Sequence, residues 1–145
     1  MIGKIFVGLL FGVFSLVFST QVFAQAEARQ KLMKANSADA KAIKAAVAAK
    51  DYTAVETKAK DIMGRAEQIA LFPKGSQTGK TRAKPEIWEK PDNFVKTAKH
   101  LGETAGELAA AAKSGDDAAV EAKFKALSDT CGSCHKTFRN AKYSE

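Results

Sequence analysis

Both cysteines of the chain and one of its two histidines lie in one short stretch near its end, DTCGSCHKTFR. The three residues are Cys131, Cys134 and His135. Two thiols and an imidazole at this spacing suit three chemistries: a structural metal site, a redox-active disulfide or a covalently attached haem. Positions three apart share one face of a helix, so both sulfurs would face a single ligand, with the imidazole turned by about 100°.

The remainder of the sequence favours the haem. A structural zinc site needs four ligands, and only His100 offers another imidazole nitrogen. His100 lies next to the apolar stripe of its helix rather than on it, so we expect it to be exposed. A thioredoxin-like cysteine pair requires a strand–helix unit, and no alternating strand pattern is present. A plain disulfide leaves the adjacent histidine unexplained. The C-x-x-C-H spacing is typical of a c-type haem held by two thioethers, with the histidine as iron ligand. A thiol–disulfide oxidoreductase is the less favoured alternative.

Residues 1–24 have the pattern of a secretory signal peptide. One basic residue, Lys4, precedes an apolar run over residues 5–18, and Val22-Phe23-Ala24 suits cleavage before Gln25. The run is shorter than the roughly 20 residues of a spanning helix, so we expect no stable membrane anchor after cleavage. Export predicts an oxidising compartment, which in a bacterium is the periplasm, where an unused cysteine pair would tend to become a disulfide.

Residues 25–145 have the size of one small domain. The whole chain has a formal net charge of +7, and its basic residues are mixed with acidic ones, as on solvated helix faces. A basic surface can attract an acidic protein or an anionic membrane. An exported protein is not expected to bind nucleic acid.

Apolar residues recur at steps of three and four in four segments, which predicts helices. The predicted inner positions are Arg29, Met33, Asn36, Ala40, Ile43 and Val47; Val55, Ala59, Ile62, Ala66 and Ile69; Phe94, Ala98, Leu101, Ala105, Leu108 and Ala112; and Val120, Phe124, Leu127, Cys131, Cys134 and Phe138. The predicted fold is all-α, an antiparallel four-helix bundle.

The segments between the stripes predict where the helices begin and end. Asp51, Asp92 and Asp116 are predicted to cap the second, third and fourth helices. Between residues 71 and 91 the periodicity stops and all three prolines occur, which predicts a long irregular crossover between the second and third helices. We expect Trp88, the only tryptophan, to pin this crossover by packing.

Three sequence blocks resemble the class II c-type cytochromes, also called the cytochrome c′ family. CGSCHKTFR (131–139) has the form C-x-x-C-H-x-x-F-R, RQKLMK (29–34) matches the family's R-x-x-x-M-K, and KPEIW (84–88) matches its K/R-P-E-I-W. The resemblance covers residues 25–145. It implies a bacterial, exported four-helix bundle with haem attached near the C-terminus.

The resemblance implies a haem site built from matching residues. Cys131 and Cys134 would hold one haem c covalently, and His135 would be the fifth iron ligand. Met33 would lie on the distal side. In low-spin members a methionine there ligates iron, and in cytochromes c′ proper the sixth position is open to nitric oxide or carbon monoxide. We favour a His135–Met33 pair suited to electron transfer, with the open, high-spin site as the alternative.

Further pocket residues follow from the same resemblance. Arg29 would meet a haem propionate, Arg139 would influence the hydrogen bonding of His135, and Trp88 and Phe138 would line the pocket. The implied function is an electron-transfer protein without catalytic residues. It would work with a redox partner protein, and a homodimer is an additional candidate assembly because family members are often dimers.

Overall fold

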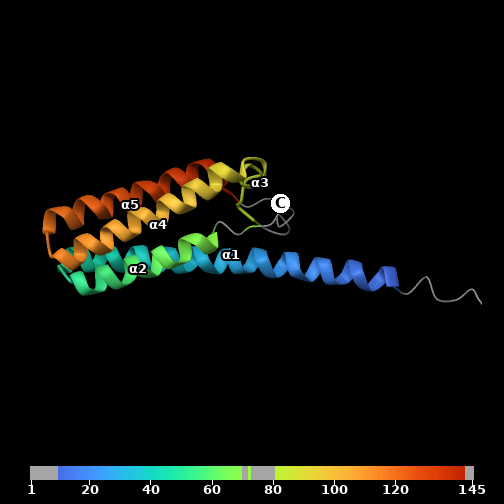
Figure 1. Cartoon of the computed structure of the whole chain (residues 1–145), viewed down its shortest axis with the longest axis horizontal. Coiled ribbons are helices and arrows are strands. Elements are labelled where there is room, and N and C mark those ends of the chain that lie inside the picture. The colour runs from blue at the N-terminus through green and yellow to red at the C-terminus, as the bar shows by residue number, and fades with distance from the viewer. Residues whose placement is uncertain (1–9, 70–71, 73–80, 143–145) are drawn as a thin grey trace, which may run out of the picture.

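The computed structural model describes residues 10–69, 72 and 81–142, with side chains from residue 27 onward (Figure 1). Within these ranges the chain is helical and contains no β-strand, which confirms the all-α prediction. The helices are α1 (Leu10–Ala49), α2 (Tyr52–Ile69), α3 (Glu86–Glu89), α4 (Pro91–Ser114) and α5 (Asp117–Phe138). Helix α3 is a single turn, and the four long helices form the predicted bundle.

The long helices run antiparallel to their neighbours in the chain. Helix α2 packs on α1 and α4, and α4 packs on α5 (Figure 1). Helix α1 extends beyond the bundle and includes residues 10–24 of the predicted signal peptide, whereas residues 1–9 lie outside the described part. Cleavage of the leader therefore stays a prediction. Among the described helices, no segment combines the length and the hydropathy that would let it span a bilayer.

Two of the three predicted helix caps are confirmed. The Asp51 carboxylate accepts a hydrogen bond from the Ala54 amide at 3.0 Å, and the Asp116 carboxylate accepts one from the Ala119 amide at 3.1 Å. Each bond satisfies an amide that the first helical turn leaves without an intrahelical partner. Gly115, with φ of +71°, closes α4 in the left-handed conformation that glycine adopts without strain.

The prediction for Asp92 was wrong. Helix α4 begins one residue earlier, at Pro91, so Lys90 occupies the cap position and makes no side-chain capping bond. Proline is well suited to a first helical position because its missing N–H would have no helical partner there. Asp92 lies in the first turn, where a negative charge still interacts favourably with the helix dipole.

The interior divides into two clusters. The alanine-rich core lies toward the end of the bundle where α1 turns into α2. Its buried members are Ile43, Ala46, Val55, Ala59, Ile62, Ala105, Leu108, Ala109, Ala111, Ala112, Val120 and Leu127. Small residues let α2 and α4 approach closely: a Cβ added at Gly102 would lie 3.2 Å from Cβ of Ala66.

The aromatic cluster lies at the other end of the bundle. Its buried members are Ile69, Ile87, Phe94, Ala98 and Phe138, and partly buried side chains that include Met33, Trp88 and Cys134 pack against it. The predicted stripes account for most of both clusters. All five predicted inner residues of α2 are buried. Eight predicted inner residues of the other helices are only partly buried: Met33, Asn36, Ala40, Val47, Leu101, Phe124, Cys131 and Cys134.

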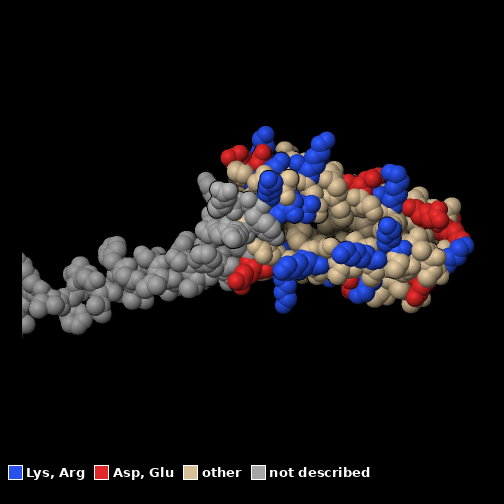
Figure 2. All heavy atoms as spheres, turned by 180° about the vertical axis from the view of Figure 1, so that it is seen from behind, with Lys and Arg blue, Asp and Glu red and all other residues tan. Residues whose placement is uncertain are grey.

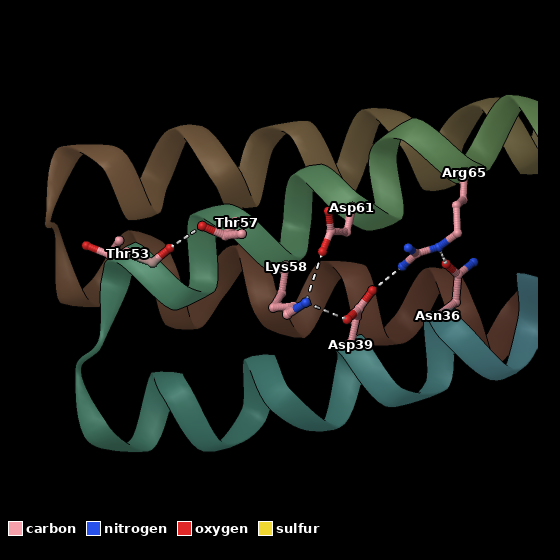
Figure 3. A network of polar contacts seen from close by, with 7 residues as sticks. All are labelled: Asn36, Asp39, Thr53, Thr57, Lys58, Asp61 and Arg65. Atoms are coloured by element: carbon pink, nitrogen blue, oxygen red, sulfur yellow. Dashed lines mark hydrogen bonds and ion pairs between the residues drawn. The ribbon is translucent and has the colours of Figure 1, made fainter.

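A network of charged side chains joins α1 to α2 (Figure 3). The Asp39 carboxylate is paired with Arg65, and with Lys58 at 3.3 Å. Arg65 Nε also donates to Asn36 Oδ1 at 2.7 Å, and Lys58 reaches Asp61 at 3.0 Å. We call these five residues the charge network. Because Asp39 is only 8% exposed, its two cationic partners offset much of the cost of removing its charge from water.

The crossover is less irregular than predicted. It contains α3, in which Ile87 is 6% exposed, and Ile87 was not among the predicted core residues. Trp88 is partly buried against the aromatic cluster, so Ile87 and Trp88 share the anchoring role that was assigned to Trp88 alone. The predicted loop positions 73–80 lie outside the described residues.

The end of the crossover is joined to the end of α5. The Lys84 amide donates to the Phe138 carbonyl at 3.0 Å, and the Asn140 amide donates to the Arg82 carbonyl at 2.7 Å. An isolated bridge between Ala83 and Arg139 lies between these bonds. We call residues 81–84 the strap, because they tie the crossover to the residues that follow the helix carrying the cysteines.

Candidate functional site

A cavity of about 330 Å³ opens at the aromatic end of the bundle, within the size range of small-molecule sites. Its wall combines residues that are far apart in the sequence. They come from α1 (Arg29, Met33), from the crossover (Phe72, Thr81, Arg82, Ala83, Ile87), from α4 (Phe94) and from α5 and the residue after it (Cys134, His135, Phe138, Arg139).

Helix α5 supplies the predicted ligand residues. Cys134 and His135 line the cavity, whereas Cys131 lies one turn earlier and is not a lining residue. Both cysteines are half-buried, and they are not joined in a disulfide. The structure therefore brings Cys134 and His135 together in the cavity and places Cys131 beside it on the same helix.

The surroundings of the thiols do not suit a dithiol enzyme. Burial raises the pKa of Cys131, and burial followed by the charge of Cys131 raises the pKa of Cys134 to about 11. Catalytic cysteines need a lowered pKa. The arrangement therefore argues against the thiol–disulfide oxidoreductase alternative.

The imidazole of His135 lies among cations. Burial lowers the pKa of His135, and the nearby Arg139 and Arg82 lower it further. The neutral imidazole is the form that ligates metals through a ring nitrogen. The structure thus places Arg139 near His135 and adds Arg82, which sequence reasoning missed. The influence of Arg139 on the hydrogen bonding of His135 stays a prediction.

Met33 lines the same cavity from α1. It is partly buried and packs against the aromatic cluster, to which Cys134 also belongs as a partly buried neighbour. The structure therefore brings together three of the predicted site residues, Met33, Cys134 and His135, from two helices.

Arg29 forms part of the cavity wall and is only 6% exposed. Its Nη2 donates to Thr81 Oγ1 at 3.4 Å, whereas its buried Nη1 has no hydrogen-bond partner among the described residues. The guanidinium carbon lies 5.0 Å from the Phe72 ring centroid and 5.5 Å from that of Trp88. Burial lowers the pKa of Arg29. A buried cation with an unused donor is costly unless an anion satisfies it.

Aromatic side chains close the apolar part of the wall. The Phe94 and Phe138 rings meet edge to face with centroids 5.1 Å apart, and Phe72 lies 5.6 Å from Phe94. Phe138 lines the cavity. Trp88 does not line the cavity, but its ring packs against the guanidinium of Arg29, which does. Phe94 and Phe72 line the cavity but were not predicted as site residues. Phe94 could have been found from its inner position on the third predicted helix, whereas Phe72 lies in a stretch without periodicity.

The zinc alternative finds no ligand set. No cluster of three or more His, Cys, Asp or Glu side chains suited to a metal ion occurs in the part of the chain that the structure describes. His100, the only other histidine, is an exposed residue of α4 whose Nδ1 lies 3.5 Å from the Glu103 carboxylate. It is the surface histidine that the sequence predicted.

Comparison with protein-family models matches residues 24–139 to the family described as cytochrome c′. The chain belongs to the cytochrome c′ family. A cytochrome c′ of Rhodospirillum rubrum is 39% identical over 122 residues, which cover 80% of this chain and 82% of that protein. The predicted resemblance to class II c-type cytochromes is thus confirmed, and the protein is a member of a haem-binding electron-carrier family.

Solved structures of cytochromes c′ share the fold. The cytochrome c′ of Thermochromatium tepidum is 29% identical with a TM-score of 0.75, covering 82% of this chain and 96% of that one. Another, described as a cytochrome c′ with an unusual ligand-controlled dimer dissociation, is 28% identical with the same TM-score and the same coverage. These matches confirm the four-helix bundle.

The residues of the cavity fit the haem that the cytochrome c′ family binds. The unpartnered Nη1 of Arg29 offers a buried donor to a carboxylate, which haem carries as propionate. Cys134 offers a sulfur and His135 a neutral imidazole in the same cavity, and the phenylalanine rings offer an apolar surface. No side chain with a negative charge lines the described wall, so every charged side chain that an anionic group meets there is basic or, in the case of His135, can become so.

Proposed function

We propose that this protein holds one haem c through thioether bonds to Cys131 and Cys134, with His135 as fifth iron ligand and the sixth position open to nitric oxide or carbon monoxide. The observation that carries the proposal is the shared cavity, into which α5 brings Cys134 and His135 and α1 brings Arg29. When bound, the haem supplies an iron that exchanges one electron and can take a diatomic ligand at an open position.

The chain's own residues have separate tasks in this proposal. Cys131 and Cys134 hold the group in place, and His135 donates a ring nitrogen to it. Arg29 satisfies one of its carboxylates, which gives the unused Nη1 a partner. The aromatic cluster excludes water from the apolar face, and that exclusion strengthens the charge interactions inside the cavity.

The name of the Rhodospirillum relative supports the open site, and so does the related structure whose dimer responds to a ligand. Sequence analysis favoured Met33 as a sixth ligand instead. Because the Met33 side chain lines the same cavity as His135, a His135–Met33 pair dedicated to electron transfer is our second candidate.

Visible absorption spectra of the purified haem protein, with and without carbon monoxide, test the two candidates. An open site predicts broad high-spin ferrous bands that change when carbon monoxide is added, and Met33→Ala should alter them little. Narrow ferrous bands that do not change when carbon monoxide is added would support the second candidate. The Met33→Ala variant should then show the broad bands of a high-spin haem. A colourless protein would refute both.

The remaining parts of the proposal concern location and partners. We propose a periplasmic protein that exchanges electrons with a redox partner protein and has no catalytic residues of its own. A homodimer is a further proposal, supported by the dimeric relative. Sedimentation of the haem protein with and without carbon monoxide would test whether a dimer exists and responds to ligand.

A further inference from the structure

The half of α1 that borders the cavity is held by polar contacts rather than by apolar packing. Along the described side chains of α1, the buried apolar ones begin only at Ile43, whereas Met33 is partly buried. Toward the cavity the buried side chains of the helix are Arg29 and Asp39, and both are charged. A fully enclosed apolar side chain fixes a helix by close packing, and the described residues 27–42 of α1 include none.

Helix α1 rests mainly on one neighbour. It packs on α2 and makes far less contact with α5. Figure 2 shows one face of the molecule hollowed along a strip of uncharged atoms, with Lys and Arg side chains on both sides of it, as expected for a bundle whose helices are not packed closely on every side. The rotation of α1 beside the cavity therefore depends on the contacts that join it to α2.

Arg65 joins the two helices at two points. Its Nε donates to Asn36 Oδ1 at 2.7 Å and its Nη2 pairs with the Asp39 carboxylate, so one guanidinium from α2 contacts two positions one turn apart on α1 (Figure 3). A guanidinium carries its donors in a rigid planar fork, which fixes direction as well as distance. Lys58 also pairs with Asp39, at 3.3 Å, but its other carboxylate partner is Asp61 on its own helix. Arg65 is thus the member of the charge network that holds α1 at two points.

Met33 lies one turn before Asn36 on the same face of α1, and it lines the cavity. A helix with its side chains has a radius of about 5–6 Å, so a rotation of α1 by about 10° moves the tip of an inner side chain by about 1 Å. A misplacement of about 1 Å can change the rate of a process at a binding site by up to about 100-fold. The rotation of α1 therefore controls how closely Met33 approaches a group bound in the cavity.

We propose that Arg65 is a positioning residue of the site: by holding Asn36 and Asp39 it fixes the rotation of α1 and keeps Met33 over the sixth position of the haem iron. The inference rests on the proposed function and deepens it, because it assigns what sets the rate at which a diatomic ligand reaches the iron. It applies to both candidates. A Met33 side chain that is held in place hinders ligand entry at an open site, and it keeps its bond to iron if it is the sixth ligand.

The test measures the rate at which carbon monoxide binds to the ferrous haem protein. Arg65→Lys keeps the positive charge near Asp39 but removes the fork. The matched control, Lys58→Gln, removes the other cation that pairs with Asp39 and leaves Arg65 and Asn36 in place. A second variant, Asn36→Ala, removes one point of contact and leaves the ion pair between Arg65 and Asp39 intact. Urea unfolding of each variant reports its stability separately.

Arg65→Lys should bind carbon monoxide about 3- to 10-fold faster than wild type, because a freer Met33 covers the sixth position for less of the time, and Asn36→Ala should act in the same direction. Lys58→Gln should change the rate less than about 2-fold, even where it lowers stability. In a Met33→Ala background Arg65→Lys should also change the rate less than about 2-fold, since the side chain through which Arg65 acts is absent. An acceleration of equal size with and without Met33, or in Arg65→Lys and Lys58→Gln alike, would overturn the proposal.

Nuclear magnetic resonance gives a readout that does not depend on rates of ligand binding. The chain contains three methionines, so isotope labelling of their methyl groups gives few signals, and Met33→Ala identifies that of Met33. In the low-spin ferrous protein, which forms with carbon monoxide or with Met33 as ligand, the ring current of the haem displaces this signal. The displacement should shrink in Arg65→Lys and stay in Lys58→Gln, while the signal of Met63, 42% exposed on α2, stays in both. An unmoved Met33 signal in Arg65→Lys would contradict the positioning role even if the rate changes.

The colour of the same samples separates this proposal from the proposed function. A haem-containing protein whose Met33 signal does not respond to Arg65→Lys would refute the positioning role alone. A colourless protein would refute the proposed function, and there the rings of the aromatic cluster, against which Met33 packs, displace its signal instead. A displacement that still responds to Arg65→Lys and not to Lys58→Gln would retain Arg65 as the residue that positions Met33 in the cavity.

Discussion

Two buried charges on helix α1 have opposite surroundings. Asp39, 8% exposed, is paired with Arg65 and Lys58 of α2. Arg29, 6% exposed, bonds Thr81 through one nitrogen, and its Nη1 has no partner among the described residues. Described side chains satisfy the first charge, whereas the second keeps a donor that a carboxylate of the proposed haem would satisfy. One region of α1 therefore stabilises the bundle, and the other fits the proposed binding site.

The hydrophobic clusters repeat this contrast. The alanine-rich core brings helices close together and is complete without a ligand. The aromatic cluster borders a cavity of about 330 Å³, and its large rings pack around that space as well as against each other. Four variants test the contrast, from the largest expected effect to the smallest.

Preventing haem attachment should have the largest effect. In the variant Cys131→Ser with Cys134→Ser, the aromatic end loses the apolar surface and the anion that a haem supplies, so its packing should become loose. We expect loss of most of the near-ultraviolet circular dichroism and amide exchange faster by more than about 100-fold at the start of α4 and the end of α5. Amides near the charge network should keep more of their protection. A cooperative, native-like melt of this apoprotein would contradict the prediction.

Removing the satisfied acid should destabilise the haem protein substantially. Asp39→Ala leaves Arg65 and Lys58 without their shared carboxylate. Breaking a fully buried ion pair costs about 3–5 kcal/mol, and the partly exposed cations reduce this to about 2 kcal/mol. Urea unfolding measures the change. The control is Asp61→Ala, which removes an exposed partner of Lys58 and should cost less than about 0.5 kcal/mol. Equal costs for the two variants would show that burial of Asp39 contributes nothing.

Replacing the unsatisfied cation should have a smaller effect that depends on the ligand. Arg29→Met keeps the length and the apolar contacts but removes the donors. In the haem protein we expect a loss of about 1–2 kcal/mol, the usual size of a charge-assisted hydrogen bond. Urea unfolding again gives the value. In the haem-free cysteine variant, where cooperative unfolding is not expected, the comparison uses amide exchange: the same change should leave the protection of α1 amides unchanged or raise it, because no anion satisfies Nη1 there. A loss of protection of equal size in both backgrounds would refute an anion partner for Arg29.

The smallest effect concerns pH at the turn between α4 and α5. Hydrogen bonds from Lys50 first, and then from Tyr52, lower the pKa of Asp117 below its ordinary value of 3.8. The folded state therefore binds a proton less readily than the unfolded state, so this carboxylate stabilises the fold above about pH 4 and loses that contribution as the pH falls through its lowered pKa.

Asp117→Asn provides the measurement. The variant should be slightly less stable than wild type at pH 7, and the difference between the two free energies of unfolding should vanish in strong acid. A difference that stays constant with pH would contradict the assigned pairing with Lys50 and Tyr52.

Regular periodicity made the bundle predictable. The five inner positions of α2 are all buried, and Asp51 and Asp116 cap their helices, because each of these features depends only on residues within a few positions. The haem motif was equally visible, since its three side chains occupy one turn of one helix. Asp92 failed as a cap because Pro91 next to it is a better first residue for a helix.

The rest of the site depends on contacts between distant segments. Arg82 reaches the cavity only because the strap bonds the residues after α5, and nothing in its local sequence indicates this. Asn36 was placed on an inner stripe correctly, but its bond to Arg65 depends on how α1 and α2 are rotated about their axes. Whether Met33 ligates iron depends on a distance that no sequence pattern encodes.

The hydrogen bonds of the strap also set an order of assembly. The turns at residues 50–51 and 115–116 close loops of a few residues, whereas Arg82 and Asn140 are 58 positions apart. Since the entropy of closing a loop grows with the logarithm of its length, the strap costs about 2.5 kcal/mol more to close than a short turn. The turn end of the bundle can therefore form early, while the mouth of the cavity closes last. That order would leave the cysteines accessible for the proposed haem attachment until folding is nearly complete.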